Sequence, residues 1–391
     1  MSTEPRRISI FDSTLRDGEQ APGNAMTPEH KLAIACALEA VGVTTVEAGF
    51  PSSSPSDFKA IQLISKALKA AKFASLARAD RRDVEAAAQA GGVVNHQLEL
   101  MATGSDVHLE HKRGIGRTEG IREVVDSIRY AASLGFTDIS LGVEDATRGC
   151  DDLLRPLFEA AVEAGAGMIV LADTTGCMLP AEFGDLVART REWIGGAVKI
   201  SVHCHDDLGL SLTNTLAALE AGADEVQVTL AGIGERAGNA ALEELAAVLT
   251  YKGTQLGLAC DVKTTALTDA YDLLCQAIGP VAPRAKSIFG ANAFSTQAGI
   301  HQAGLLRNPI TYEYVEPEMF GRQRRILVGR HSGRNVVRHV FAQLGRPAGN
   351  GDPLVEEVYR EYVADRTGGT CITIEELRGI VSDRIEGAGA R

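Results

Sequence analysis

The chain has 391 residues, with 39 Lys and Arg against 51 Asp and Glu, which gives a formal net charge of −12. This acidic balance, with no basic run along a helical pattern, argues against a nucleic-acid-binding protein, because phosphate contacts need a basic patch. No apolar stretch reaches about 18 residues, so the sequence predicts no membrane span. Seven cysteines without a C-x-x-C pair argue against a disulfide framework and indicate reduced thiols in the cytoplasm.

The first part of the chain alternates short β-rich runs with stretches of helical period. The β-rich runs lie at 8–11, 45–50, 73–77, 97–102, 138–143, 168–172, 199–204 and 225–230. The helical stretches between them include 30–40, 122–133, 153–164 and 212–221. Gly42, Gly165 and Gly222 each follow a helical stretch and precede a β-rich run, which is typical of helices that end at a left-handed glycine.

Eight strands that alternate with helices predict an α/β fold with a parallel sheet and right-handed crossovers. The number of repeats favours a closed (β/α)8 TIM barrel over residues 1–285, since an open dinucleotide-binding sheet would carry G-x-G-x-x-G after its first strand. Residues 286–345 show no strand–helix alternation, 346–353 are typical of a linker, and 354–388 indicate two helices. We therefore expect a mainly helical C-terminal subdomain over residues 286–391.

Polar residues that follow barrel strands are candidates for an active site, because the loops at that end build it. His203 and His205 lie two apart at the end of the seventh strand, so both point to one face while Cys204 points away. Asp17 follows the first strand and Asn239 the eighth. These side chains suit Mg²⁺ or Mn²⁺, with Zn²⁺ as an alternative. Each also has a structural interpretation, such as a partly buried histidine, a solvated turn or, for Asn239, a helix N-cap.

Further polar residues lie at the same predicted end of the barrel. Arg16 could hold an oxyanion or a carboxylate, and Glu144, after the fifth strand, is a candidate general base. Thr174 follows the sixth strand. The glycine-rich loop 232–239 either offers N–H groups to an anion or is only a tight turn. A 2-oxo acid would chelate a metal here through its carboxylate and ketone oxygens, and the metal would polarise the ketone for attack by a carbanion.

Three separated segments resemble the isopropylmalate synthase / homocitrate synthase family of metal-dependent barrel enzymes. The segments are FDSTLRDGEQAPG at 11–23, HCHDDLG at 203–209 and GIGERAGNA at 232–240. The resemblance covers about residues 6–340. It implies an acyltransferase that condenses acetyl-CoA with a metal-bound 2-oxo acid in a Claisen-type reaction and then hydrolyses the thioester.

The resemblance also implies roles for individual residues. The implied metal ligands are Asp17, His203, His205 and Asn239. The implied catalytic and substrate-binding residues are Arg16, Glu144, Thr174, His301 and Tyr312. Among these, Arg16 would stabilise the developing alkoxide, Thr174 would lie near the substrate carboxylate, and His301 would assist enolisation or hydrolysis. In relatives the segment that contains His301 reaches into the partner's barrel, so we expect a homodimer.

The resemblance leaves the 2-oxo acid open. The segment GFPSSSPSDF at 49–58 resembles isopropylmalate synthases, whereas the short C-terminal region is more similar to homocitrate synthases. Four residues depart from the family pattern, namely Asp206, Ala231, Ala303 and Leu98. Leu98 is interpreted as replacing a histidine on the fourth strand that faces the substrate.

Other functions also remain open. A homocitrate or citramalate synthase is one alternative, and a C–C lyase of the same superfamily is another. Such lyases carry a cysteine in the loop after the eighth strand, and residues 232–239 contain none, which argues against that activity. A non-catalytic relative is a third alternative, and the intact Arg16, Asp17 and His203 argue against it.

Overall fold

The computed structural model describes residues 4–364 and 369–389. The chain divides into two compact units, Met1–Val281 and Ala282–Arg391. Among the described residues, no helix is both long enough and apolar enough to cross a lipid bilayer.

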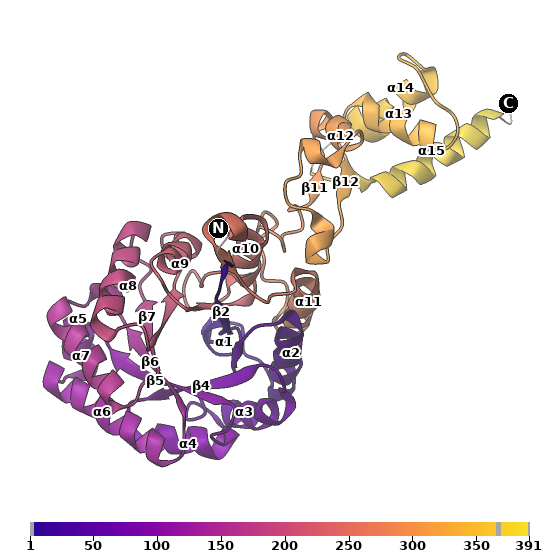
Figure 1. Cartoon of the computed structure of the whole chain (residues 1–391). Coiled ribbons are helices and arrows are strands. Elements are labelled where there is room, and N and C mark those ends of the chain that lie inside the picture. Colours follow the sequence, from indigo (N-terminus) through magenta and orange to yellow (C-terminus); the bar gives the residue numbers. More distant parts are fainter. Residues whose placement is uncertain (1–3, 365–368, 390–391) are drawn as a thin grey trace. The chain divides into compact units, whose positions relative to one another are not determined.

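Within residues 4–281, eight parallel strands close into a barrel in chain order, as the ring in Figure 1 shows. The strands are β2 (Ser9–Asp12), β3 (Thr45–Glu47), β4 (Lys72–Arg78), β5 (His96–Thr103), β6 (Asp138–Glu144), β7 (Met168–Asp173), β8 (Lys199–Cys204) and β9 (Glu225–Val228). The ring closes because β2 pairs with β3 on one side and with β9 on the other. The predicted (β/α)8 barrel is confirmed.

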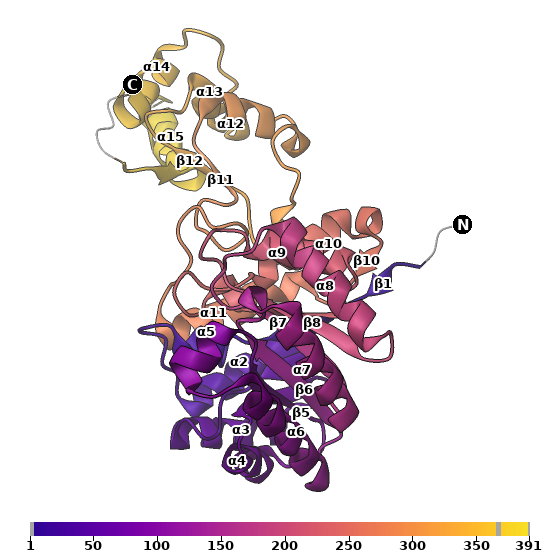
Figure 2. The same ribbon diagram turned by 90° about the vertical axis from the view of Figure 1, so that its left-hand side faces the viewer.

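Helices cover the outside of the barrel (Figures 1 and 2). The long helices of this unit are α2 (Pro28–Val41), α3 (Pro55–Ala67), α4 (Arg81–Gly91), α6 (Arg117–Ser133), α7 (Asp151–Ala164), α8 (Pro180–Ile194), α9 (Ser211–Glu220), α10 (Leu242–Leu256) and α11 (Leu267–Ile278). Helices α2 and α7 end at Gly42 and Gly165, whose φ angles are +96° and +118°. A left-handed residue of this kind ends a helix and turns the chain towards the next strand, as the sequence predicts.

Shorter elements connect the strands and helices. They are α1 (Asp17–Gln20), α5 (Asp106–His108), β1 (Arg6–Arg7), β10 (Leu258–Ala259), the π-helical turns Leu109–Arg113 and Arg360–Ala364, and the 3-10 turns Ala146–Arg148, Leu230–Gly232, Thr264–Ala266, Pro309–Thr311 and Pro317–Phe320. Strands β1 and β10 form a separate parallel pair.

The strands direct alternate side chains to the barrel interior and to the helices, as period 2 requires. Phe73 of β4 faces the helices, because a Cβ added at Gly91 of α4 would lie 2.5 Å from its ring. Glycine at position 91 therefore allows the close approach of helix and strand. The side chains that face the helices form the apolar core. Polar side chains that face the barrel interior form the candidate site.

The second unit combines helices with a small sheet. Its elements are β11 (Ser295–Thr296), α12 (Gly299–Leu305), β12 (Arg325–Val328), α13 (Arg334–Gln343), α14 (Pro353–Tyr359), β13 (Ile372–Thr373) and α15 (Ile374–Gly389). Strand β12 pairs with β11 in parallel and with β13 antiparallel. The mainly helical character is confirmed, but the expected lack of strand–helix alternation before residue 345 is wrong. Strand β11 has only two residues, too few to produce a period in the sequence.

Buried side chains from β12, α13, α14, α15 and the π-helical turn Arg360–Ala364 form a core of their own in this unit. They are Val328, Val336, Val337, Val340, Phe341, Val355, Val358, Val363, Leu377 and Val381. The two helices expected in 354–388 correspond to α14 and α15, and residues 365–368 between them lie outside the described residues.

Candidate metal centre and active site

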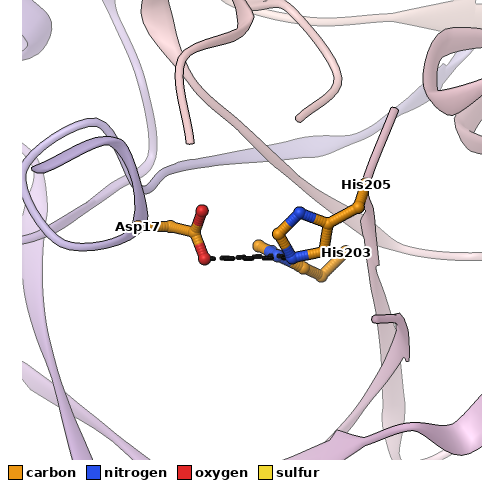
Figure 3. Close-up of side chains that lie close together, drawn as sticks. All are labelled: Asp17, His203 and His205. Atoms are coloured by element: carbon orange, nitrogen blue, oxygen red, sulfur yellow. Dashed lines mark hydrogen bonds and ion pairs between the residues drawn. The ribbon is translucent and has the colours of Figure 1, made fainter. Parts of the chain in front are cut away.

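Three predicted ligands meet at the end of the barrel where the strands terminate. Asp17 begins α1, which follows β2 after a four-residue turn, His203 lies in β8, and His205 follows that strand. Asp17 Oδ2 is 3.8 Å from His203 Nε2 and 4.0 Å from His205 Nε2, and the two Nε2 atoms are 3.2 Å apart. Figure 3 shows the three side chains pointing towards one another. All three side chains are buried.

The geometry of this group fits a divalent metal ion. At metal–ligand distances of about 2.1 Å, adjacent ligands of an octahedral ion would lie about 3 Å apart. The three atoms here are 3.2, 3.8 and 4.0 Å apart, close to that spacing. Two imidazole nitrogens and one carboxylate oxygen are ligands that Mg²⁺, Mn²⁺ and Zn²⁺ accept. The side chain of Cys204 is buried on the other face of β8, and burial raises the pKa of its thiol, so it stays protonated.

Asn239 reaches the same place from the loop after β9. It forms an isolated bridge with His205, and its Nδ2 donates to Asp17 Oδ1 at 2.8 Å. Its Oδ1 is buried and accepts no hydrogen bond among the described residues, which leaves an oxygen free to face a cation. The interpretation of Asn239 as a helix N-cap is wrong, because α10 begins at Leu242 and Ala241 precedes it.

Arg16 and the local charges keep the ligands in their metal-binding forms. Arg16 Nη1 lies 2.8 Å from Asp17 Oδ2, and Arg16 Nε lies 2.8 Å from Glu47 Oε1. Burial alone would raise the pKa of Asp17, but the Arg16 guanidinium and the two imidazoles outweigh it and hold that pKa below its usual range. Burial lowers the pKa of His203 to about 3, so its ring is neutral near pH 7, as a ligand must be.

The glycine-rich loop closes over Asp17. The Glu235 N–H donates to Asp17 Oδ1 at 3.2 Å. A Cβ at Gly234 would lie 2.1 Å from Asn239 Nδ2 and 2.6 Å from Asp17 Oδ1, so only glycine fits between them. In the structure, the anion that this loop binds is therefore the carboxylate of Asp17.

A cavity of about 350 Å³ opens beside the three ligands and collects most of the predicted site. The sequence-predicted residues that line it are Arg16, Asp17, Glu144, Thr174, His203 and His205. Glu144 is the last residue of β6, and its Oε1 accepts from Lys112 Nζ at 2.7 Å. Thr174 Oγ1 accepts the Asp145 N–H at 2.9 Å, which leaves the hydroxyl hydrogen free to donate to a bound anion.

His301 and Tyr312 lie in the second unit. His301 is on α12, and its ring centroid is 4.3 Å from that of Tyr312. Both side chains are exposed, Tyr312 to 48%. The structure thus brings these two residues together within the second unit.

Sequence reasoning missed several inward-facing polar residues and misplaced one residue. Glu99 and Met101 of β5 line the cavity, so Leu98, one position before Glu99, faces the helices, where it is fully buried. The expectation that Leu98 faces the substrate is therefore wrong, and Glu99 occupies the inward position. Burial raises the pKa of Glu99 to about 8. Gln227 of β9 also lines the cavity, and polar residues inside β-rich runs were the available signal.

The fold and the residue cluster define a class of protein, the (β/α)8 barrels with a group of candidate metal ligands at the carboxyl ends of the strands. Comparison with known proteins narrows this class. Residues 7–274 match the HMGL-like family, and residues 288–361 match the family described as homocitrate synthase post-HMGL domain-like.

Named relatives cover most of the chain. A probable 2-isopropylmalate synthase of Ignicoccus hospitalis is 40% identical over 98% of this chain and 93% of its own length. A 2-isopropylmalate synthase of Nitratidesulfovibrio vulgaris is 42% identical over 88% of this chain and 68% of its own. A putative (R)-citramalate synthase of Methanopyrus kandleri is 40% identical over 97% and 73%. The chain belongs to the isopropylmalate synthase / homocitrate synthase family.

Solved structures support the fold alone. An HMG-CoA lyase of Bacillus subtilis superposes with a TM-score of 0.62 over 72% of this chain and 96% of its own, at 22% identity.

Proposed function

We propose that the protein is an acyltransferase of the 2-isopropylmalate synthase type. It condenses acetyl-CoA with a 2-oxo acid and then hydrolyses the thioester. The observation that carries this proposal is the convergence of Asp17, His203 and His205 beside a cavity that Arg16 also lines. The cofactor in this proposal is Mg²⁺ or Mn²⁺, with Zn²⁺ as an alternative, and Asn239 completes the ligand set.

The residues of the chain have separate tasks in this reaction. When bound, the divalent ion supplies a Lewis acid that polarises the ketone. Thr174 donates to the substrate carboxylate. A base formed by Glu144 together with His301 removes a proton from the acetyl methyl group, and the resulting carbon bonds to the ketone carbon. The Arg16 guanidinium stabilises the charge that develops on the former ketone oxygen, and such charge stabilisation is commonly the largest catalytic contribution.

The second half of the reaction releases coenzyme A. Water attacks the thioester carbonyl, the carbon–sulfur bond breaks, and the thiolate of coenzyme A takes up a proton. His301 is the proposed proton carrier in this step, with Tyr312 beside it at 4.3 Å between ring centroids. A histidine suits this role because its imidazole ring can both accept and donate a proton.

The charges that line the cavity favour a 2-oxo acid with an uncharged side chain. Each lining cation among the described residues already has an acidic partner: Arg16 with Asp17 and Glu47, Arg78 with Asp83, Lys112 with Glu144, and Arg236 with Asp207. Glu99 adds a buried carboxyl group. A second substrate carboxylate would thus lack a free cation, which favours 2-isopropylmalate or citramalate formation over homocitrate formation.

We further propose a cytoplasmic homodimer in which residues 286–391 contribute to the active site and to the dimer contacts. The exposure of His301 and Tyr312 supports this arrangement, since neither is held in a finished pocket of its own unit. Ile300 and Ile310 beside them are 79% and 78% exposed, and such apolar side chains gain from being covered. Sedimentation equilibrium tests the dimer, and a monomer at all concentrations contradicts it.

The activity is tested by following free coenzyme A. Purified protein is incubated with acetyl-CoA, Mn²⁺ or Mg²⁺ and a panel of 2-oxo acids, and a thiol reagent measures the coenzyme A released. We expect release that needs both the metal and a monocarboxylic 2-oxo acid. A reaction without 2-oxo acid and a reaction of the Asp17→Asn variant are the controls. Release that no 2-oxo acid increases contradicts the proposal, and cleavage of the condensed product alone points to a lyase.

A further inference from the structure

A buried chain of hydrogen bonds links the far wall of the cavity to one of the metal-ligand candidates. Glu99 Oε2 accepts from Gln227 Nε2 at 2.7 Å, and Gln227 Oε1 lies 2.9 Å from His203 Nδ1. The three residues are 2%, 1% and 7% exposed. Strands β5, β9 and β8 contribute one residue each, so the chain of hydrogen bonds crosses the barrel interior.

An acceptor at Glu99 Oε2 fixes the order of donors and acceptors along this chain. The Glu99 oxygen is an acceptor, so the amide group of Gln227 must direct its NH₂ towards it and its oxygen towards His203. A carboxyl group with its proton on Oε2 would reverse this order, but a carboxylate, or a carboxyl group with its proton on Oε1, gives the order that the structure shows. His203 then carries its hydrogen on Nδ1, and Nε2 is left with a lone pair.

That lone pair points where the metal would lie. His203 Nε2 is the atom that faces Asp17 Oδ2 at 3.8 Å and His205 Nε2 at 3.2 Å. Without an acceptor at position 99, the Gln227 amide could rotate by half a turn and offer NH₂ to Nδ1. The imidazole would then carry its hydrogen on Nε2 and could not bind a cation through that atom.

The neighbouring backbone makes room for the Glu99 carboxyl group. A Cβ at Gly142 of β6 would lie 2.8 Å from Glu99 Oε1 and 3.2 Å from its Cγ. Glycine at this position therefore allows the side chain to lie against β6 and reach Gln227.

We propose that Glu99 and Gln227 are positioning residues that fix the Nδ1–H tautomer of His203 and so keep Nε2 available to a divalent ion. The inference rests on the metal-dependent function proposed above. It concerns how the chain prepares the site before the metal arrives, and it can be measured on metal-free protein.

The first measurement is metal affinity, with Mn²⁺ alone as the probe. We expect Glu99→Leu and Gln227→Leu each to weaken the Mn²⁺ Kd by about 10- to 100-fold, the usual effect of removing a partner of a metal-binding histidine. Glu99→Gln keeps an acceptor oxygen and should retain most of the affinity. The double variant should bind about as weakly as Gln227→Leu alone, because both residues act through one contact.

The matched control is Glu225→Gln. Glu225 lies on β9 two positions before Gln227, is equally buried, and makes no hydrogen bond to a ligand candidate among the described contacts. We expect its Mn²⁺ Kd to stay within about twofold of the parent protein. Thermal unfolding of every variant identifies any that fails to fold. If Glu99→Leu does not fold, Gln227→Leu provides the test of metal affinity.

The second measurement is the tautomer itself. The ¹⁵N shifts of His203 in metal-free protein should show a protonated Nδ1 and an unprotonated Nε2, and Glu99→Leu should shift the population towards the other tautomer. An unchanged tautomer and an unchanged Mn²⁺ Kd in both leucine variants overturn the inference. Absence of Mn²⁺ binding by the parent protein contradicts the proposed function instead, while the ¹⁵N shifts still decide the tautomer.

Discussion

The candidate metal ligands of the barrel unit are buried, whereas the candidate site residues of the second unit are exposed. In the barrel unit, Asp17, His203 and His205 are 3%, 7% and 6% exposed and lie within 4.0 Å of one another. In the second unit, His301 and Tyr312 are exposed and lie on short elements. A closed ring of strands brings side chains from distant segments into one buried group, whereas short helices leave theirs at the surface until something covers them.

This difference in burial predicts that substitutions in the two units affect different measured properties. Changes in the barrel unit should alter metal binding or the free energy of unfolding, because its residues support one another. Changes at the exposed pair in the second unit should alter turnover alone.

The largest effect is expected at the metal centre. His203→Ala should abolish turnover and weaken Mn²⁺ binding by more than about 100-fold, since even losing a partner of such a ligand costs about 10- to 100-fold. Cys204→Ala is the matched control, because Cys204 is the next residue on the same strand and its buried side chain points away. Calorimetric Mn²⁺ titration and coenzyme A release measure both. Substantial turnover by His203→Ala would mean that the site lies elsewhere.

The next effect separates the two units. His301→Ala should lower kcat by about 10²- to 10⁴-fold, the usual contribution of a general acid or base. Its Mn²⁺ Kd should be unchanged, because the barrel supplies the proposed ligands. His339→Gln, a half-buried histidine on α13 of the same unit, is the control. Weaker Mn²⁺ binding by His301→Ala would contradict the claim that the barrel unit alone supplies the metal ligands.

The third effect is on stability and lies in the barrel unit. Lys31 is fully buried between Glu19 Oε2 and Asp57 Oδ1, both at 2.5 Å. Lys31→Met leaves two acids without their cation and should lower the free energy of unfolding by about 3–5 kcal/mol. Lys72→Met, at a half-exposed pair with Asp138, should cost less than about 1 kcal/mol. Urea titration compares the two, and equal losses would contradict the assigned role of burial.

The smallest expected effect is an increase in the free energy of unfolding. Ala231 has φ +57°, a left-handed conformation that asparagine tolerates better than alanine. Ala231→Asn should raise the free energy of unfolding by about 0.5–1 kcal/mol. Ala21→Asn, at φ −62°, should leave it nearly unchanged. Urea titration under the same conditions measures both variants, and a loss at position 231 would show that local packing outweighs the backbone strain.

Much of the barrel could be predicted because its signals are local. Period 2 in the strands, period 3.6 in the helices and glycines such as Gly42 depend on neighbouring residues only. The separation of His203 and His205 by two positions was sufficient to place both on one face. The structure confirms the closed barrel that these signals imply.

Contacts across the barrel could not be predicted, because they depend on which strands face each other and in which register. Gln227 and Glu99 are 128 positions apart, and no local period links them. An error of one position placed Leu98 where Glu99 lies, since a strand reverses the direction of its side chains at each residue. The two-residue strands of the second unit gave no period at all.

The way the barrel closes has a consequence for assembly of the protein. Asp17 and Asn239 are separated by 222 positions and meet only after β2 has paired with β9. A cation held there would link the first and last strands of the barrel. At a metal concentration [M], it would stabilise the closed barrel by RT ln(1 + [M]/Kd), which is about 2.7 kcal/mol when [M] is a hundred times Kd. A fragment that stops short of β8 would contain six of the eight barrel strands but, of the ligand candidates, only Asp17.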